Sequence, residues 1–399
     1  MNSYDVGGVR LPRPFKIRRL GHTGFNVSSF DKAIEFYTRI LGFRVTDSID
    51  VKTMPGLPEG VQAIEDGRGT FLTYGSDHHA FVLLHKSVDD VLGRSIPGIT
   101  LNQITWQVNT LSEVVEGGKF LTGQGTEIDR IGRDMPGSNW HVYFRGPDGT
   151  SNEIYYGIEQ IGWNRKSKPQ EMRVAFSGMI VLPQRPESLE IADAGAHGVN
   201  IDSGHQIPAP LSPTYPVGGV LLERPFKVVR LGPLRLFVPS VDETAAFYRD
   251  VLGLTLTEEV VFDGMRCFFL RSGSEHHSLA LYPLALRERL GFSRHSQCMS
   301  LGLQVGSYSQ LRDALRFFGR QGCKIVDFPA ELHPGIDCTV NVLDPEGHCI
   351  QLYYYMEQIG WDGLPRPAHL RRASNANWPE SIEPHSDTFA DSAFQGPVD

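Results

Sequence analysis

Two nearly identical stretches of the chain differ at one residue that could bind a metal ion. GPDGTSNEIYYGIEQIGW spans residues 146–163, and DPEGHCIQLYYYMEQIGW spans residues 344–361. Each pattern predicts a tight turn that leads into a strand, in which alternate residues share one face. Glu153 in the first copy is replaced by Gln351 in the second. A carboxylate binds divalent cations more strongly than a neutral amide does, so we expect the two copies to share a fold and to differ in chemistry.

Further metal-binding and polar residues fall on the predicted polar faces of other strands. The alternation of IRRLGHTGFNV (17–27) places His22 on one face together with Gly24, and the alternation of LNQITWQV (101–108) does the same for Gln103. Imidazole and carboxylate groups are common ligands of divalent transition metals. Tyr143 lies on the polar face of the strand before Glu153. Polar faces on several strands predict a curved sheet that lines a wet cavity.

The elements that carry these residues follow a repeated order. After the first strand, FDKAIEFYTRILGF (30–43) has helical spacing and stops at Gly42, and extended segments follow near 44–51, 69–74 and 79–85. A second module runs from residue 101 through the helix-like LSEVVEGGKFLTG to the hairpin at 146–157. Tyr37 and Gly42 recur as Tyr248 and Gly253, 211 residues later. The sequence therefore predicts an α+β fold of four β-α-β-β-β modules.

These modules suggest a division of the chain into four parts. We expect a first domain at 1–163 with the metal site, a Pro-, Gly- and Ser-rich extended linker at 164–216, a second domain at 217–362 and a polar tail at 363–399. The linker is expected to pack on the surface, and the tail to be disordered or draped over the protein.

Composition narrows the class of protein. The chain has 399 residues, 40% of them hydrophobic and 21% charged, which is ordinary for globular domains. A net charge of −8 argues against nucleic acid as the main partner. We find no long apolar run or leader at the N-terminus and expect a cytoplasmic protein with no membrane partner. All five cysteines lie in the second half without CxxC spacing, which favours buried free thiols.

The paired modules, with a first-strand His, an FY…LGF helix, a DHH strand and a PDG…NE hairpin, resemble the vicinal oxygen chelate superfamily. Within it, the chain is most similar to the type I extradiol ring-cleaving dioxygenases. The resemblance implies that modules pair into two glyoxalase-like cups, and that two first-strand histidines and a last-strand glutamate hold Fe(II). It places these ligands at His22, Gln103 and Glu153. Gln103 departs from the dioxygenase pattern, because an amide oxygen is a weaker ligand than imidazole.

Other positions can be compared with the same family. The resemblance assigns Tyr143 to the substrate oxygen, and His78 or His79 to the bound oxygen, although His276-His277 repeats this pair in the second half and packing explains it equally well. A further family histidine corresponds to Asp134, unless His141 compensates. The ligand positions of the second half are occupied by the three residues Pro233, Ser300 and Gln351. We therefore expect no metal site in the second half.

Three functions follow from this resemblance. The first hypothesis is a dioxygenase that cleaves a catechol-like aromatic substrate with O2 and uses Fe(II), or alternatively Mn(II). The second is a metal-dependent isomerase or lyase of the glyoxalase or epimerase type, which Gln103 favours and Val82, at the fourth ligand position of those enzymes, disfavours. The third is a small-molecule binding protein without catalysis, supported by the absence of two family histidines. The fold also leads us to expect a homo-oligomer.

Overall fold

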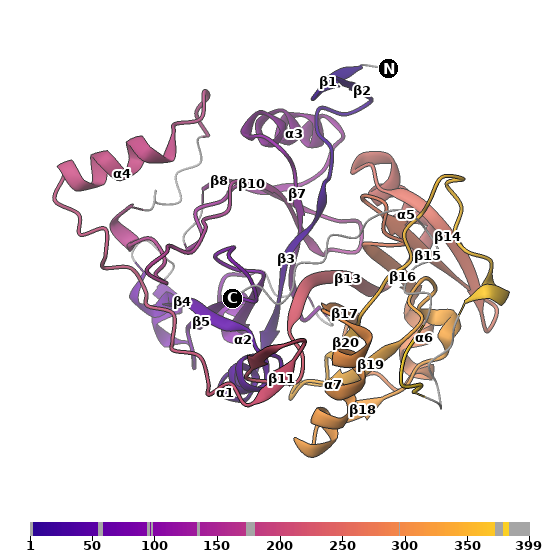
Figure 1. Cartoon of the computed structure of the whole chain (residues 1–399). Helices are drawn as coiled ribbons and strands as arrows, with labels where there is room; N and C mark the ends of the chain where they lie inside the picture. The colour runs from indigo at the N-terminus through magenta and orange to yellow at the C-terminus, as the bar shows by residue number, and fades with distance from the viewer. Residues whose placement is uncertain are drawn as a thin grey trace.

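The computed structural model describes residues 3–54, 59–93, 96, 99–133, 136–172, 180–294, 296–371 and 378–382. Its N-terminal and C-terminal halves lie side by side, and each contains one large sheet (Figure 1). Each sheet has eight strands and combines parallel with antiparallel neighbours. This arrangement confirms the predicted α+β fold of four β-α-β-β-β modules, paired two by two.

The first sheet joins two modules through its central strands. Its strand order is β4 (Arg44–Asp50), β5 (Arg68–Thr73), β6 (Phe81–His85), β3 (Arg19–Val27), β7 (Leu101–Gln107), β10 (Ser151–Tyr156), β9 (Trp140–Arg145) and β8 (Ile128–Arg133). The first strand of each module runs parallel to the last strand of the same module, and β3 and β7 meet antiparallel at the centre. Residues from both modules can therefore converge at the β3–β7 junction.

The second sheet repeats this topology. Its order is β14 (Thr255–Phe262), β15 (Met265–Arg271), β16 (Leu279–Pro283), β13 (Val228–Val238), β17 (Cys298–Val305), β20 (Cys349–Tyr353), β19 (Thr339–Leu343) and β18 (Ile325–Val326). A two-stranded hairpin precedes each large sheet, β1 (Tyr4–Val6) with β2 (Val9–Leu11) and β11 (Tyr215–Val217) with β12 (Val220–Leu222).

Helices cover the sheets. The helices of the first half are α1 (Phe30–Glu35), α2 (Lys86–Val91) and α3 (Leu111–Gly123), and those of the second half are α5 (Val241–Ala246), α6 (Leu284–Arg289) and α7 (Tyr308–Arg320). The predicted helix at 30–43 is α1 continued by one π-helical turn, η1 (Phe36–Ile40), and it ends just before Gly42, where φ is +89°. A π-helical turn, η5 (Phe247–Val251), follows α5 in the same way.

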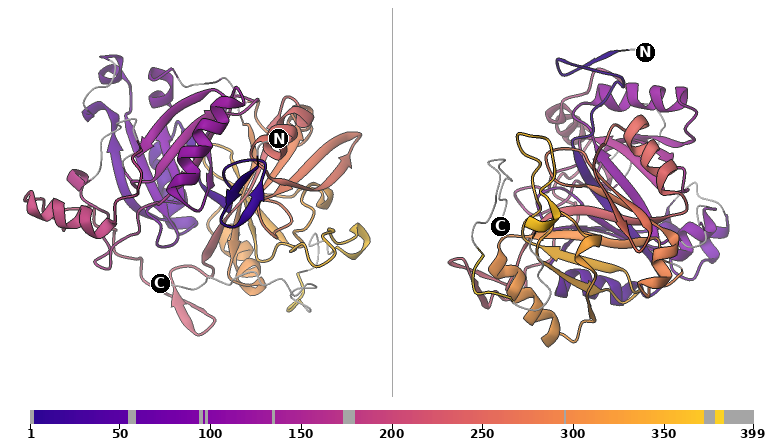
Figure 2. Two further views of the ribbon diagram at one scale, coloured as in Figure 1. Left: turned by 90° about the horizontal axis from the view of Figure 1, so that it is seen from above. Right: turned by 90° about the vertical axis from the view of Figure 1, so that its right-hand side faces the viewer.

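The stretch at 164–216, predicted as an extended linker, contains a helix. Helix α4 (Glu187–Ala196) projects from the first half in two views of the molecule (Figures 1 and 2). It buries none of its residues, so the apolar periodicity that would announce a packed helix is weak. None of the helices among the described residues is both long and apolar enough to cross a membrane.

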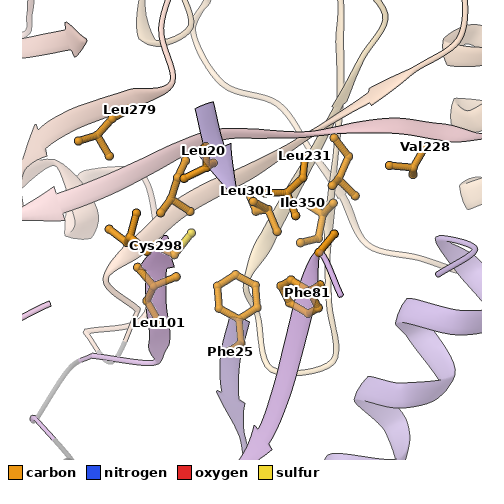
Figure 3. Packing of buried hydrophobic residues seen from close by; sticks show 14 of the residues in the cluster. Leu20, Phe25, Phe81, Leu101, Val228, Leu231, Leu279, Cys298, Leu301 and Ile350 are labelled. Carbon is orange, nitrogen blue, oxygen red and sulfur yellow. The ribbon is translucent and has the colours of Figure 1, made fainter. Parts of the chain in front are cut away.

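One hydrophobic core extends through both halves. Phe25, Phe81 and Leu101 of the first half belong to the same buried cluster as Leu301 and Ile350 of the second, and their side chains face one another across the boundary (Figure 3). The halves are consequently not independent in packing, although each has its own sheet.

Candidate functional site

His22 and Glu153 meet in the interior of the first sheet. Their side chains are 1% and 0% exposed, and His22 Nε2 lies 3.2 Å from Glu153 Oε2. Glu153 Oε2 nevertheless accepts no hydrogen bond from the described residues. Two ligands of one metal ion, each about 2.1 Å from it and at right angles, would lie roughly 3 Å apart. The separation of the two atoms therefore fits a shared metal ion.

The local backbone explains why His22 points inward. The register of β3 against β7 shifts between Leu20 and Thr23, so the peptide groups of His22 cannot join the regular ladder. The Thr105 hydroxyl provides the missing hydrogen bonds. It accepts one from the His22 N–H at 2.6 Å and donates one to the His22 carbonyl oxygen at 2.7 Å. Glu153 pairs with Thr105 from the other side, on β10. Thr105 thus fixes both ligands relative to each other.

Neighbouring side chains orient the pair further. Asn139 donates from Nδ2 to Glu153 Oε1 at 2.5 Å, which leaves Oε2 for another partner. The Tyr155 ring lies 4.9 Å from the His22 ring. It can approach because residue 21 is glycine; a Cβ there would lie 2.2 Å from Tyr155 Cε1. Glycine at this position is required by the close approach of the tyrosine.

The Glu153 carboxyl is anionic at neutral pH. Burial by itself raises its pKa, but His22, His141 and Tyr143 outweigh burial, so the pKa of Glu153 lies below its usual value. A buried carboxylate without full hydrogen bonding is costly unless a cation compensates it. This requirement adds to the geometric evidence for a cation at the site.

Gln103 and Tyr143 lie next to this pair. Both are buried, 8% exposed each, and Tyr143 donates from its hydroxyl to Gln103 Oε1 at 3.1 Å. Tyr143 also pairs with Glu153 across β9 and β10. Within the described part of the chain, no three His, Cys, Asp or Glu side chains converge where a metal could be held. A third protein ligand would therefore be Gln103, through the oxygen that now accepts from Tyr143.

The two histidines of the predicted pair, His78 and His79, lie in different surroundings. The His79 ring is 4.4 Å from the His22 ring, whereas His78 turns away toward Asp47, with Nε2 3.6 Å from Asp47 Oδ2. The two Nδ1 atoms of His78 and His79 are 3.1 Å apart. His79 therefore adjoins the site and His78 supports it from behind.

His141 is buried, and its ring lies 4.8 Å from the Tyr143 ring. It adds positive potential near Glu153. Asp134, the other residue compared with a family histidine, is outside the described residues.

The second sheet places an arginine among the matching positions. Arg235, which is 1% exposed, donates to Ser300 Oγ at 3.2 Å and to Gln351 Oε1. A third contact joins its Nη2 to His277 Nε2 at 3.3 Å. Ser300 and Gln351 correspond to Gln103 and Glu153, so a guanidinium lies where the first sheet presents its ligands. A fixed cation at this position repels a metal cation, which agrees with the lack of a ligand set in the second sheet.

Arg235 corresponds to Gly24 of the first sheet. Each pairs with the residue at the Gln103 position, since Gly24 faces Gln103 and Arg235 faces Ser300. A Cβ on Gly24 would lie 2.4 Å from the Val82 carbonyl oxygen. A side chain is thus excluded from this position in the first sheet.

Comparison with known proteins agrees with the fold. The model of the Glyoxalase/Bleomycin resistance protein/Dioxygenase superfamily matches residues 19–154 and 230–352. The chain belongs to this superfamily. The two matches cover both sheets and all five residues of the first-sheet site, which we define as His22, His79, Gln103, Tyr143 and Glu153.

Several superfamily members are similar over long stretches. Catechol-2,3-dioxygenase of Bacillus subtilis is 21% identical over 262 residues, 66% of this chain and 73% of that protein. Metapyrocatechase 2 of Cupriavidus necator is 29% identical over 146 residues, 36% of this chain and only 38% of the relative's length. The chain is therefore related to ring-cleaving dioxygenases, at low sequence identity.

Solved structures share the fold. The 2,3-dioxygenase LapB of Pseudomonas sp. KL28 has a TM-score of 0.55 at 16% identity and covers 88% of this chain and 96% of its own. The Mn(II)-bound glyoxalase of Novosphingobium aromaticivorans has a TM-score of 0.54 at 15% identity. The match covers 87% of this chain and 85% of the glyoxalase.

Sequence reasoning missed two residues that support the first-sheet site, Thr105 and Asn139, and the arginine at the matching place in the second sheet, Arg235. Thr105 was on the predicted polar face, but nothing in its spacing indicated that it bonds the His22 backbone. Asn139 lies in a loop, where periodicity carries no information. Arg235 could have been found, because it stands 211 residues after Gly24, at the repeat distance of the first strands.

Proposed function

We propose that the first-sheet site binds a divalent metal ion and a small aromatic diol, and that the protein is a ring-cleaving dioxygenase of the extradiol type. The observation that carries the proposal is the buried His22–Glu153 pair, 3.2 Å apart with Glu153 Oε2 lacking a hydrogen bond. Metal-dependent ring cleavage is consistent with the names of the dioxygenase relatives. We propose Fe(II), with Mn(II) as the alternative that the Mn(II)-bound glyoxalase neighbour suggests.

His22 and Glu153 would hold the metal, with Gln103 as the third protein ligand. When bound, the metal would supply Lewis acidity that lowers the pKa of the diol and would bring diol and O2 side by side. Because the low pKa of Glu153 keeps it anionic, it can compensate the charge of the cation. The two ligands are almost fully buried, so bulk water is excluded from the reacting groups.

Tyr143 and His79 would act on the substrate. In this structure the Tyr143 hydroxyl donates a hydrogen bond to Gln103 Oε1. When Gln103 turns to the metal, the hydroxyl can instead donate to one of the two diol oxygens of the substrate. His79 packs against the His22 ring and is placed to accept or return a proton beside the metal ligand. His78 would position His79 through the contact between their Nδ1 atoms.

The test is reconstitution with Fe(II) under anaerobic conditions, followed by a panel of catechols and a measurement of oxygen uptake. We expect iron to bind in about one equivalent, oxygen to be consumed and a yellow ring-opened product to form. Glu153→Gln should abolish both metal binding and oxygen uptake. The matched control, Gln351→Ala in the second sheet, should retain them. A protein that binds no metal and consumes no oxygen with any catechol would refute the proposal.

A second candidate function is a metal-dependent isomerase or lyase without oxygen chemistry. Gln103 favours it, because its amide oxygen faces the site and accepts a bond from Tyr143. Turnover of a substrate with metal but without oxygen uptake would distinguish this function from ring cleavage.

A further inference from the structure

The second sheet contains a hollow of about 130 Å³ at its β18–β19 edge. Its lining includes the polar residues Asp327, His333, Thr339 and Asn341, the aromatic residues Phe328 and Trp378, and the aliphatic residues Leu315, Ile325 and Val340. Trp378 comes from the C-terminal segment and stacks on Tyr308 of α7. The hollow therefore has both polar and aromatic lining residues.

Two residues that line this space are smaller than the residues at the corresponding positions of the first sheet. Asn341 pairs with Gln351 as Tyr143 pairs with Glu153, so Asn341 replaces a tyrosine. Thr339 replaces His141 by the same register, since Thr339 faces Tyr353 and His141 faces Tyr155. In the first sheet the His141 and Tyr143 rings pack against each other, and the Arg130 guanidinium lies 4.1 Å from the centre of the Tyr143 ring.

The polar lining offers a hydrogen-bond acceptor. Asn341 is 2% exposed, and its Oδ1 has no hydrogen-bond partner among the described residues, while its Nδ2 donates to Thr339 Oγ1 at 3.4 Å. His333 Nδ1 lies 3.2 Å from the Ile336 carbonyl, which assigns the ring proton to Nδ1. Burial, aided by the charge of Arg235, lowers the pKa of His333 to about 4. The ring is thus neutral at pH 7 and is held by backbone groups of Ile336 and Phe328.

The buried positive charge of Arg235 affects which hydrogen-bond donor would bind in the hollow. The guanidinium is bonded to a serine, a glutamine and a histidine, with no carboxylate among these partners. Its positive potential reaches His333 on the wall of the hollow. A positive potential favours a donor whose oxygen can carry partial negative charge, as a phenolic hydroxyl does and an aliphatic alcohol does less.

We propose that this hollow binds a one-ring phenol, whose hydroxyl donates to Asn341 and whose ring packs against Phe328 and Trp378. The size agrees, because an engineered apolar cavity of about 150 Å³ in another protein takes up benzene. An aromatic ring that packs on an aromatic wall is stabilised beyond the burial of its area. The site is separate from the first-sheet site and needs no metal.

The test is calorimetric titration of the full chain with 4-fluorophenol in the presence of a chelator, so that a metal at the first-sheet site does not contribute. We expect one equivalent to bind, more tightly than fluorobenzene, which lacks the donor, and than cyclohexanol, which lacks the flat ring. Asn341→Tyr, which restores the residue of the first sheet, should fill the hollow and abolish binding. Tyr143→Phe is the matched control and should leave the titration unchanged.

A second variant keeps the test decisive if Asn341→Tyr does not fold. Asn341→Leu preserves the size of the side chain and removes the acceptor, so 4-fluorophenol should lose about tenfold in affinity while fluorobenzene should not. Absence of saturable binding to the chelated wild-type protein would overturn the proposal. Equal losses for both ligands, or binding by a folded Asn341→Tyr variant, would overturn it as well. Failure of ring cleavage would not affect this result, because the titration requires no activity.

Discussion

The two sheets bury charges of opposite sign at matching places. The first buries the Glu153 carboxylate beside His22, and the second buries the Arg235 guanidinium beside Gln351. A buried carboxylate with one oxygen free of hydrogen bonds attracts a cation, whereas a fixed guanidinium repels one. A change of charge at two positions therefore accounts for the difference between the proposed metal site in the first half and the fixed guanidinium in the second.

Replacement of Tyr143 by phenylalanine separates binding of the metal from chemistry. The variant removes the hydroxyl that donates to Gln103 Oε1 and leaves His22 and Glu153 in place. We expect metal content to be unchanged and kcat/KM for a catechol to fall by about 10²–10³, as for loss of one hydrogen-bond donor to a reacting oxygen. Metal analysis and steady-state kinetics on the same sample check this. An unchanged kcat/KM would show that Tyr143 only fills space.

Gln351→Glu should stabilise the protein. It places a carboxylate on Arg235, which has no acidic partner among its hydrogen bonds. A buried ion pair that neutralises an existing buried charge should raise the free energy of unfolding by about 1–3 kcal/mol. The new carboxyl has a folded pKa below its unfolded value of about 4.3, so the gain is present at pH 7 and is lost as pH falls through the folded pKa.

Thermal melts of the wild type, Gln351→Glu and Gln351→Leu at pH 7 and at pH 3.5 measure this effect. The leucine variant has no acceptor for Arg235 and should melt below the wild type at both pH values. A Gln351→Glu variant that melts no higher than the wild type at pH 7 would contradict the expected pairing.

The sequence identified His22 and Glu153 as a pair but not their surroundings. Alternation along a strand indicates which residues share a face, and the loss of Glu153 in the repeat indicates which face matters. It does not indicate which loops reach that face, so Asn139 could not be found. Arg235 was overlooked because it corresponds to a glycine, and the comparison of the two halves followed only positions where a ligand was already expected.

At the scale of elements, one contact between the C-terminal segment and the second sheet is made by an acidic residue of β14. Glu258 accepts from Arg371 at 3.1 and 2.7 Å and lies 3.0 Å from His276 Nε2. Burial raises the pKa of Glu258, but His276 and Arg371 lower it further than burial raises it. Its folded pKa therefore lies below the unfolded one, and the contact contributes stability above the unfolded pKa.

Glu258→Gln should lower the free energy of unfolding by about 1 kcal/mol at pH 7, a value reduced for the partial exposure of the pair. The difference from the wild type should shrink as pH falls through the folded pKa of Glu258, because both proteins then carry a neutral side chain there. Denaturant titrations at pH 7 and pH 3.5 check the sign. Asp47→Asn alters the corresponding residue of the first sheet and is the matched comparison, with a longer contact to its histidine of 3.6 Å.

Strands and helices were predictable to the extent that they bury one face. The strands at the β3–β7 junction and the end of the first helix at Gly42 followed from alternation and from a C-terminal glycine. Helix α4 buries no residue, so its apolar residues gave only a weak periodic signal. The π-helical turns were also missed, because their i to i+5 hydrogen bond, such as that from Leu41 N to Phe36 O at 3.1 Å, changes the apolar spacing by one residue only.

At the scale of the whole molecule, the two halves hold each other through crossed contacts between repeated motifs. Tyr37 at the π-helical turn of the first half donates to Asp344 Oδ2 at 3.0 Å, in the β19–β20 turn of the second. Tyr248 of the second half donates to Asn152 Oδ1 at 3.0 Å, next to the β9–β10 turn of the first. The repeated helix and turn motifs of the two halves are thus also the places where the halves contact each other.

These crossed contacts and the shared core predict that the protein unfolds as one unit. Tyr37→Phe and Tyr248→Phe each remove a hydroxyl from a fully buried pair and should each cost about 1–2 kcal/mol, with Tyr37→Phe the larger because its partner is a carboxylate. Since Phe25 and Leu101 of the first half pack with Leu301 of the second, either variant should shift a single transition rather than separate two. Denaturant unfolding followed by tryptophan fluorescence and by circular dichroism measures this, with coincident curves expected for the wild type and both variants. Two resolved transitions, only one of which moves in each variant, would show instead that the sheets fold independently and that the shared core contributes little.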